Sequence, residues 1–94
     1  MMIHKPRMSV KYDRPVDVLH IVVGEPLAYE GDGRPGGIEL DYSIDDGVPC
    51  GAKVIGLKKY GWPNRLGELA EILSKHLSID PSILTRDIAR HMER

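Results

Sequence analysis

The spacing of the apolar residues changes once along this chain, and that change constrains the fold more than any single motif. After Met8 the apolar residues alternate as they do in β-strands, and turn residues separate the runs. From Asn64 onward they recur at helical spacing. A chain of 94 residues suits one domain. The pattern predicts a single α+β domain over 8–94, with a β-hairpin unit (8–57), a helical pair (63–94) and residues 1–7 as a flexible leader.

The first two strands are predicted in "MSVKYD" and "VLHIVV", which the bend "DRPVD" joins. In this bend Pro15 fixes its own φ, and the carboxylates of Asp13 and Asp17 can accept hydrogen bonds from free amides of the turn. Asp13, Pro15 and Asp17 are therefore expected to be structural residues of the turn.

The second of these strands is apolar on both faces, which is typical of a strand that is covered twice. If the helices cover one face, a second subunit or a loop can cover the other, and a protein can bind through this face or through an exposed sheet edge. The interface is then expected at Val18, His20 and Val22.

Between Gly24 and Gly37 the chain is rich in glycine and proline, and we expect a long mobile connector there. Its glycines have the spacing of a dinucleotide-binding loop, but such a loop must open a helix, and here the strand-like "IELDYSI" follows.

The next segment is predicted to be a second hairpin with a three-residue loop, in which Gly47 takes the left-handed conformation. This register makes one face apolar, and a proline at position 49 indicates an edge or a bulge. It pairs Ile44 with Val48, Tyr42 with Cys50, Leu40 with Ala52, Ile38 with Val54 and Glu39 with Lys53. The expected sheet is antiparallel and four-stranded, built from two β-hairpins.

Two C-terminal helices are expected to pack on one face of this sheet. In the first, Asn64 is a candidate N-cap, and a stripe of leucines with Ala70 forms the apolar face. In the second, Asp80 caps the helix and Pro81 takes its first position.

Charged residues suggest two further kinds of site. Three acids on one strand face are candidates for a loose Mg²⁺ or Mn²⁺ site, which would support a metal-assisted enzyme. A basic aromatic segment and a C-terminal arginine stripe suggest nucleic-acid binding instead. The acids are Glu39, Asp41 and Asp45, and the nucleic-acid candidates are Lys58, Lys59, Tyr60, Trp62, Arg86, Arg90 and Arg94. In the competing interpretation Trp62 packs internally and the arginines pair with acids.

Other chemistry has little support. Cys50 is the only cysteine, which excludes an intrachain disulfide, and its expected place is the buried hairpin face. The four histidines show no ligand spacing, so neither a catalytic group nor a cofactor is predicted. No stretch has the length of a signal peptide or a membrane span, and a cytoplasmic protein is expected.

The segments "YDRPVDVLHI" and "LDYSIDDGVPCGAKVI" follow the patterns Tyr-Asp-x3-Asp-x-Leu-x-Ile and Leu-Asp-Tyr-x-x-Asp-Gly-x-x-x-Gly. Together they resemble the short prokaryotic proteins grouped as domain of unknown function 2283, over about Met8 to Leu57. The resemblance implies a compact unit of two β-hairpins and no established activity.

The net charge of −1 gives no overall attraction to nucleic acid or membrane. The leading hypothesis is a non-enzymatic interaction module that forms a homodimer and binds another protein.

Overall fold

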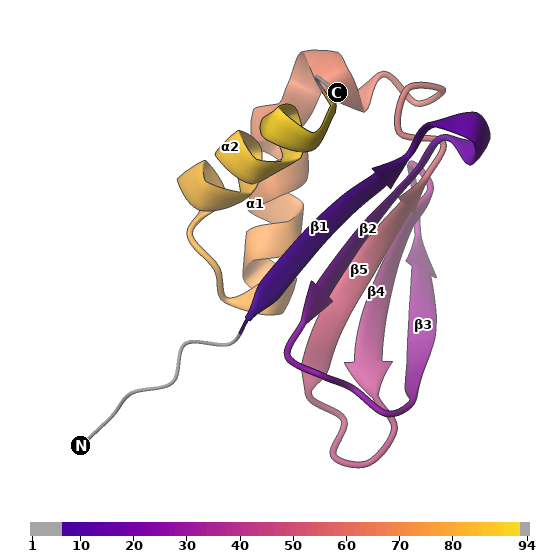
Figure 1. Ribbon diagram of the computed structural model, residues 1–94, viewed down its shortest axis with the longest axis vertical. Coiled ribbons are helices and arrows are strands. Elements are labelled where there is room, and N and C mark those ends of the chain that lie inside the picture. The colour runs from indigo at the N-terminus through magenta and orange to yellow at the C-terminus, as the bar shows by residue number, and fades with distance from the viewer. Residues whose placement is uncertain (1–6, 93–94) are drawn as a thin grey trace.

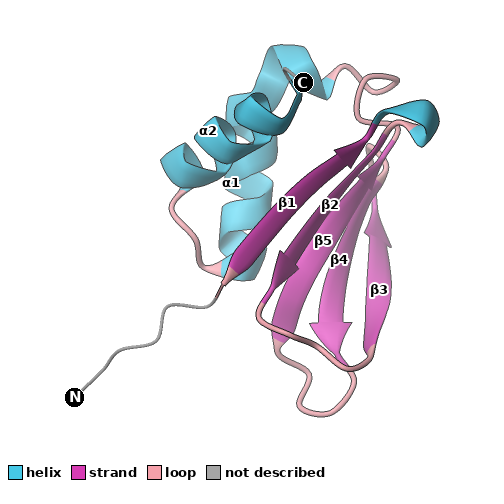
Figure 2. Cartoon of the chain, viewed as in Figure 1, coloured by secondary structure: helices cyan, strands magenta, loops and turns pink. Residues whose placement is uncertain are grey.

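The structure is a computed structural model that describes residues 7–92. It contains one antiparallel sheet with the strand order β1-β2-β5-β4-β3 and two helices that lie together on one face of that sheet (Figures 1 and 2). The strands are β1 (Met8–Asp13), β2 (Val18–Val23), β3 (Tyr29–Arg34), β4 (Ile38–Ser43) and β5 (Pro49–Ile55), and the helices are α1 (Leu66–Leu77) and α2 (Pro81–Met92). Short 3-10 turns cover Arg14–Val16 (η1) and Trp62–Arg65 (η2). The α+β class, the antiparallel sheet and the two C-terminal helices are confirmed.

The predicted number of strands is wrong, because the sheet has five and not four. The extra strand, β3, lies inside the segment expected to be a mobile connector, and it pairs with β4 along its whole length. Its glycines have poor β-propensity, but a strand at a sheet edge needs only one hydrogen-bonded neighbour. Gly37, in the turn that follows, has a φ of 76°, and a Cβ there would meet the Ile55 carbonyl oxygen.

The core lies between the sheet and the helices. Alternation along β2 sends Leu19 and Ile21 into it, and α1 and α2 contribute their apolar stripes. The fully buried large side chains are Leu19, Ile21, Val54, Leu57, Leu69, Leu73, Leu84 and Ile88. Within residues 7–92 both helices cover the same face, so the side chains that alternate with this set form the open face of the sheet.

The predicted β4–β5 register is confirmed at Ile38–Val54, Glu39–Lys53 and Leu40–Ala52, and Gly47 has the expected positive φ of 71°. Nearer the turn the prediction is wrong, because Tyr42 pairs with Pro49 and not with Cys50. A β-bulge between Asp41 and Tyr42 shifts the register, which agrees with the irregularity expected at Pro49. The Ser43 amide then donates to the Val48 carbonyl, so Ile44 belongs to the turn and does not pair with Val48.

Asp17 stabilises more than the bend in which it lies. Its carboxylate accepts hydrogen bonds from the amides of Lys58 and Lys59 and from the Tyr12 hydroxyl at 2.7 Å. Its backbone carbonyl accepts from the amides of Gly56 and Leu57. Asp17 therefore ties the first hairpin to the loop that leaves β5, whereas the side chain of Asp13 caps nothing in η1.

The helix starts are predicted correctly in one case of two. The Asp80 carboxylate accepts from the amide and the hydroxyl of Ser82, and Pro81 opens α2 as expected. Asn64 is not the N-cap of α1, because it lies inside η2 and the cap position is taken by Arg65.

We expect Asp17→Asn to lower the free energy of unfolding by about 2 kcal/mol at pH 7, because an amide accepts two backbone N–H donors less well than a carboxylate. Burial opposes the charged carboxylate, but the Lys58 amide and the Tyr12 hydroxyl outweigh it, so the pKa of Asp17 lies below its ordinary value. Its contribution is present above the unfolded-state pKa and is lost as the pH falls through the folded-state pKa. Urea unfolding at pH 7 and pH 3 measures this, and the loss should be smaller at pH 3.

Asp13→Asn is the matched control, since it changes the same bend without removing a cap. Equal losses in the two variants at pH 7 would contradict the role given to Asp17.

Candidate functional site

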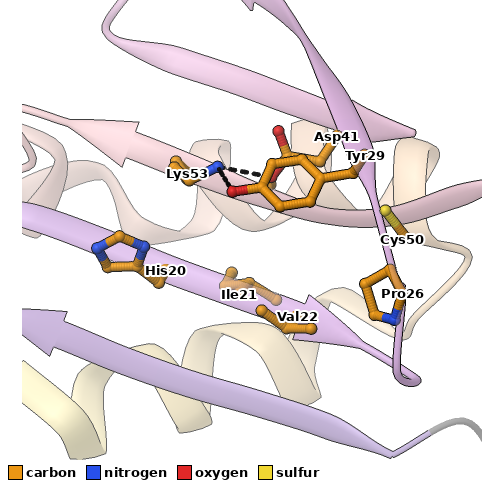
Figure 3. Close-up of a pocket in the computed structure, with 9 residues that line it drawn as sticks. His20, Ile21, Val22, Pro26, Tyr29, Asp41, Cys50 and Lys53 are labelled. Atoms are coloured by element: carbon orange, nitrogen blue, oxygen red, sulfur yellow. Dashed lines mark hydrogen bonds and ion pairs between the residues drawn. The ribbon is translucent and has the colours of Figure 1, made fainter. Parts of the chain in front are cut away.

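The side chain of Lys53 is the centre of a polar cluster on the open face of the sheet. Its ammonium donates to the Tyr29 hydroxyl at 2.8 Å, to Glu39 Oε2 at 2.9 Å and to Asp41 Oδ2 at 3.3 Å. It also lies 4.2 Å from the centroid of the Tyr29 ring. Figure 3 shows Tyr29 lying across Asp41 with its hydroxyl toward Lys53. All three ammonium hydrogens therefore have acceptors.

Three strands bring these groups together through their register. Glu39 of β4 lies opposite Lys53 of β5, and Gly31 of β3 lies opposite Asp41. Gly31 is needed because a Cβ there would overlap the Glu39 side chain. The absence of a side chain at position 31 therefore leaves room for the Glu39 carboxylate to reach Lys53.

Asp41 is the most deeply buried member of the cluster, with 6% of its side chain exposed. Its Oδ1 atom is buried and accepts no hydrogen bond from any residue that the structure describes. Burial and the neighbouring Glu39 raise the pKa of Asp41 to about 6, although Lys53 acts in the opposite direction. The hydrogen bonds to Asp41 and Lys53 lower the pKa of Glu39. Of the two acids, Asp41 is the one that holds a proton in mildly acidic solution.

A cavity of about 70 Å³ lies beside this cluster. Polar walls come from the cluster and from His20 of β2, and one apolar wall is Pro26, from the connection between β2 and β3 (Figure 3). The residues that line it are His20, Ile21, Val22, Pro26, Tyr29, Asp41, Cys50, Ala52 and Lys53.

Cys50 faces this cavity because it is the extra residue of the β-bulge. It is buried, as expected, but Tyr42 pairs with Pro49 in its place, and Cys50 is not a member of the core cluster. Burial and the nearby carboxylates of Asp41 and Asp46 raise the pKa of the Cys50 thiol. A thiol in that state is a weak nucleophile at neutral pH.

The predicted interface residues lie together on the open face. Val18 and His20 are half-buried, while Val22 is 40% exposed. Val18 lies directly opposite Ile55 of β5, which is 52% exposed, and His20 lies opposite Lys53. The apolar part of this face therefore continues onto β5, at a residue that the sequence did not single out.

The three residues predicted for a metal site are only partly brought together. Glu39 and Asp41 are neighbours on the open face, but Asp45 lies in the exposed turn after β4. The ammonium of Lys53 takes the place between the two carboxylates that a cation would occupy. No group of three or more His, Cys, Asp or Glu side chains suited to a metal ion occurs in residues 7–92.

The nucleic-acid candidates are dispersed between the loop after β5 and helix α2. Trp62 is 5% exposed, its indole N–H donates to the Gly36 carbonyl, and the Arg65 guanidinium lies 4.2 Å from its ring. It has no free face on which a base could stack, which agrees with the competing interpretation. The loop after β5 exposes Lys58, Lys59 and Tyr60, and α2 exposes Arg86 and Arg90. Arg86 forms an ion pair with Asp87. Arg94 lies outside the described residues.

Two residues of the site region could not be identified from the sequence motifs. Tyr29 lies in the glycine-rich segment, where the Pro35-Gly36-Gly37 turn before β4 was the one sequence signal of a preceding strand. His76, at the end of α1, has its Nε2 atom 2.9 Å from the Gly51 carbonyl oxygen and 3.1 Å from that of Asp41. Because both partners are acceptors, this nitrogen carries the proton, and the ring ties α1 to the bulge behind Asp41.

Comparisons with protein-family models, curated proteins and solved structures found no match. Membership in the family of domain of unknown function 2283 therefore stays a prediction. Among the described residues, no helix has the length and apolar character needed to cross a membrane.

We expect Asp41→Asn to raise the free energy of unfolding by about 1 kcal/mol at pH 7.5 and to leave it nearly unchanged at pH 4. The raised pKa means that the folded state binds the Asp41 proton more tightly than the unfolded state. The stability that this tighter proton binding gives the folded state is fully present below the unfolded-state pKa. It is lost as the pH rises through about 6. Asparagine stays neutral throughout and avoids the loss.

The difference in unfolding free energy between variant and parent, from urea titrations between pH 4 and 8, measures this effect. Asp45→Asn, in the exposed turn, should give no such pH-dependent difference. A difference for Asp41→Asn that is the same at both ends of the range would contradict the assignment.

Proposed function

We propose that this chain is a self-associating interaction module that packs the open face of its sheet against a second copy. The observation that carries the proposal is the exposed apolar area on a face that no helix covers. Ile55 and Val22 are exposed on it, and the half-buried Val18 lies opposite Ile55, while His20 and Lys53 separate this pair from Val22. Exposed apolar side chains on an uncovered surface are typical of protein interfaces.

The charges of this face fit association with a second copy. Lys11 and Lys53 lie on it with Glu39 and Asp41, so both signs are present. In a two-fold symmetric contact each residue of one copy meets the equivalent surface of the other, and a mixture of signs allows opposite charges to face each other.

The size of the domain points the same way. A chain of this length has a small core, and burying a second apolar face stabilises the folded state through association. The resemblance to the short prokaryotic proteins of domain of unknown function 2283, which implies no established activity, is compatible with such a role only by analogy.

We expect Ile55→Glu to weaken self-association about tenfold or more, because it places a carboxylate in the apolar part of the contact. Ile55 is already half exposed, so the variant should fold. Sedimentation equilibrium over a range of protein concentrations measures the association constant. The matched control is Ile83→Glu on α2, at an isoleucine that is 38% exposed on the helical side.

Two outcomes would count against the proposal. A monomer mass for the parent protein at every concentration would remove self-association. A dimer that survives Ile55→Glu but is lost in Gly33→Pro, and not in Gly33→Ala, would move the contact to the β3 edge. A Cβ at Gly33 meets nothing within 4 Å, so Gly33→Ala leaves the neighbouring side chains in place.

A further inference from the structure

The outer edge of β3 presents backbone groups that no strand within residues 7–92 pairs with. The Ile44 amide donates to the carbonyl of the directly opposite Ala28, so these two residues form a hydrogen-bonded pair that extends the β3–β4 ladder. Hydrogen bonding alternates along an antiparallel ladder, so the even-numbered residues of β3 bond to β4. Tyr29, Gly31 and Gly33 therefore point their N–H and C=O groups outward, at the end of the sheet where β3 is the last strand (Figure 1).

This edge is open to a further strand. Edge strands are commonly protected by a proline, a lysine, a bulge or a covering helix. The sequence of β3 contains neither proline nor lysine, its pairing with β4 is regular throughout, and the two helices pack against β5 and β1. Two of the outward-facing residues are glycines, and the Tyr29 side chain lies across Asp41 toward Lys53 (Figure 3). No side chain at these three positions therefore shields the backbone.

The charges of β3 determine which strand fits. Glu30 and Asp32 lie on the helical face of the sheet, opposite Tyr42 and Leu40, and in a new ladder they would occupy the positions where opposing side chains are closest. Five acids stand against one base on β3 and on the loops beside its first residue: Glu25, Glu30, Asp32, Asp45 and Asp46 against Arg34. A segment that places lysine or arginine opposite Glu30 and Asp32 complements this charge.

The other face of β3 favours large side chains in the added strand. Gly31 and Gly33 lie on the open face of the sheet, and a Cβ at Gly33 would meet nothing within 4 Å. An aromatic or β-branched side chain opposite an edge glycine covers backbone that is otherwise exposed. Beside the start of β3, Leu27 is 94% exposed and Ile44 is 57% exposed, which gives an apolar contact for the end of the same segment.

We propose that the outer edge of β3 binds an extended basic segment of another protein, which adds to the sheet as a sixth, antiparallel strand. Its lysine or arginine side chains face Glu30 and Asp32, and aromatic or β-branched side chains alternate with them over Gly31 and Gly33. The edge lies three strands away from β2, so this binding does not rest on the self-association proposed for the open face.

A second copy of this chain fits the edge less well. Two-fold antiparallel pairing of β3 with itself about Gly31 places Glu30 against Asp32, and pairing about Asp32 places that acid against its equivalent. Pairing about Gly33 sets Gly31 against Pro35, which has no N–H to donate. Each register therefore loses either charge complementarity or a ladder hydrogen bond.

The experiment adds the acetylated and amidated peptide TYKVKVTL to the ¹⁵N-labelled protein and measures amide hydrogen exchange. In the antiparallel register its lysines face Asp32 and Glu30, and its tyrosine and first valine face Gly33 and Gly31. At a peptide concentration about ten times the Kd, exchange should slow about tenfold at Tyr29, Gly31 and Gly33. It should change little at Glu30 and Asp32, whose amides already bond to β4. This alternation separates strand addition from general attraction to an acidic surface.

Variants of the peptide test the charge and the backbone separately. The peptide TYEVEVTL, with glutamate in place of both lysines, should bind about tenfold more weakly or worse. An N-methyl group on the valine between the lysines removes the N–H that donates to the Gly31 carbonyl, and it should weaken binding about tenfold. The matched control carries the N-methyl group on the second lysine, whose N–H points away from β3, and its affinity should stay within about threefold.

Variants of the protein locate the site. Glu30→Lys should weaken binding of TYKVKVTL about tenfold or more. Glu71→Lys makes the same change of charge at an exposed residue of α1, and it should weaken binding less than about threefold. The amide spectrum of each variant reports whether it is folded. Ile55→Glu should keep the affinity even if it abolishes dimers, which separates failure of this proposal from failure of the proposed function.

Four results would overturn the proposal. Three of them are unchanged exchange at Tyr29, Gly31 and Gly33 in excess peptide, equal binding of the glutamate peptide, and equal binding of the two N-methylated peptides. The fourth is slow exchange at these amides that rises with protein concentration when no peptide is present, because the occupant of the edge would then be a second copy of this chain.

Discussion

The single layer formed by α1 and α2 is the constraint on which the rest of the structure depends. Two helices of twelve residues cover one face of a five-stranded sheet, and they supply the core from that side alone. The side chains on the other face must then be stabilised by one another, by water or by another molecule. Lys53, Tyr29, Glu39 and Asp41 stabilise one another through their hydrogen bonds. The side chains of Val22 and Ile55 stay exposed within the described residues.

The bulge in the central hairpin connects the two sides of the sheet. It turns Cys50 toward the cavity. The carbonyls of Asp41 and Gly51 beside it accept hydrogen bonds from His76 Nε2. Asp41 is therefore held from the helical side through its backbone while its carboxylate faces the cavity. The carboxylate is buried beside Glu39, and these two causes raise its pKa.

Much of this fold follows from local pattern, and the remainder depends on contacts far apart in sequence. The pairing of Glu39 with Lys53 was predictable because only one register makes a hairpin face apolar, and the cap at Asp80 is a local signal. The position of Tyr29 was not predictable, because the glycines of β3 obscure the strand pattern and this edge strand is held by its pairing with β4. Asp17 was recognised as a turn residue, but its main partners lie more than forty residues away.

The proposed self-association of the open face is coupled by electrostatics to the Lys53 cluster. A second copy that covers Ile55 also removes water from that neighbouring cluster, and the cost of desolvation grows with the uncompensated charge there. Two carboxylates face one ammonium in the cluster, so protonation of Asp41, whose pKa is about 6, reduces that charge and lowers the cost. By linkage, association should then raise the affinity of Asp41 for its proton by the same factor.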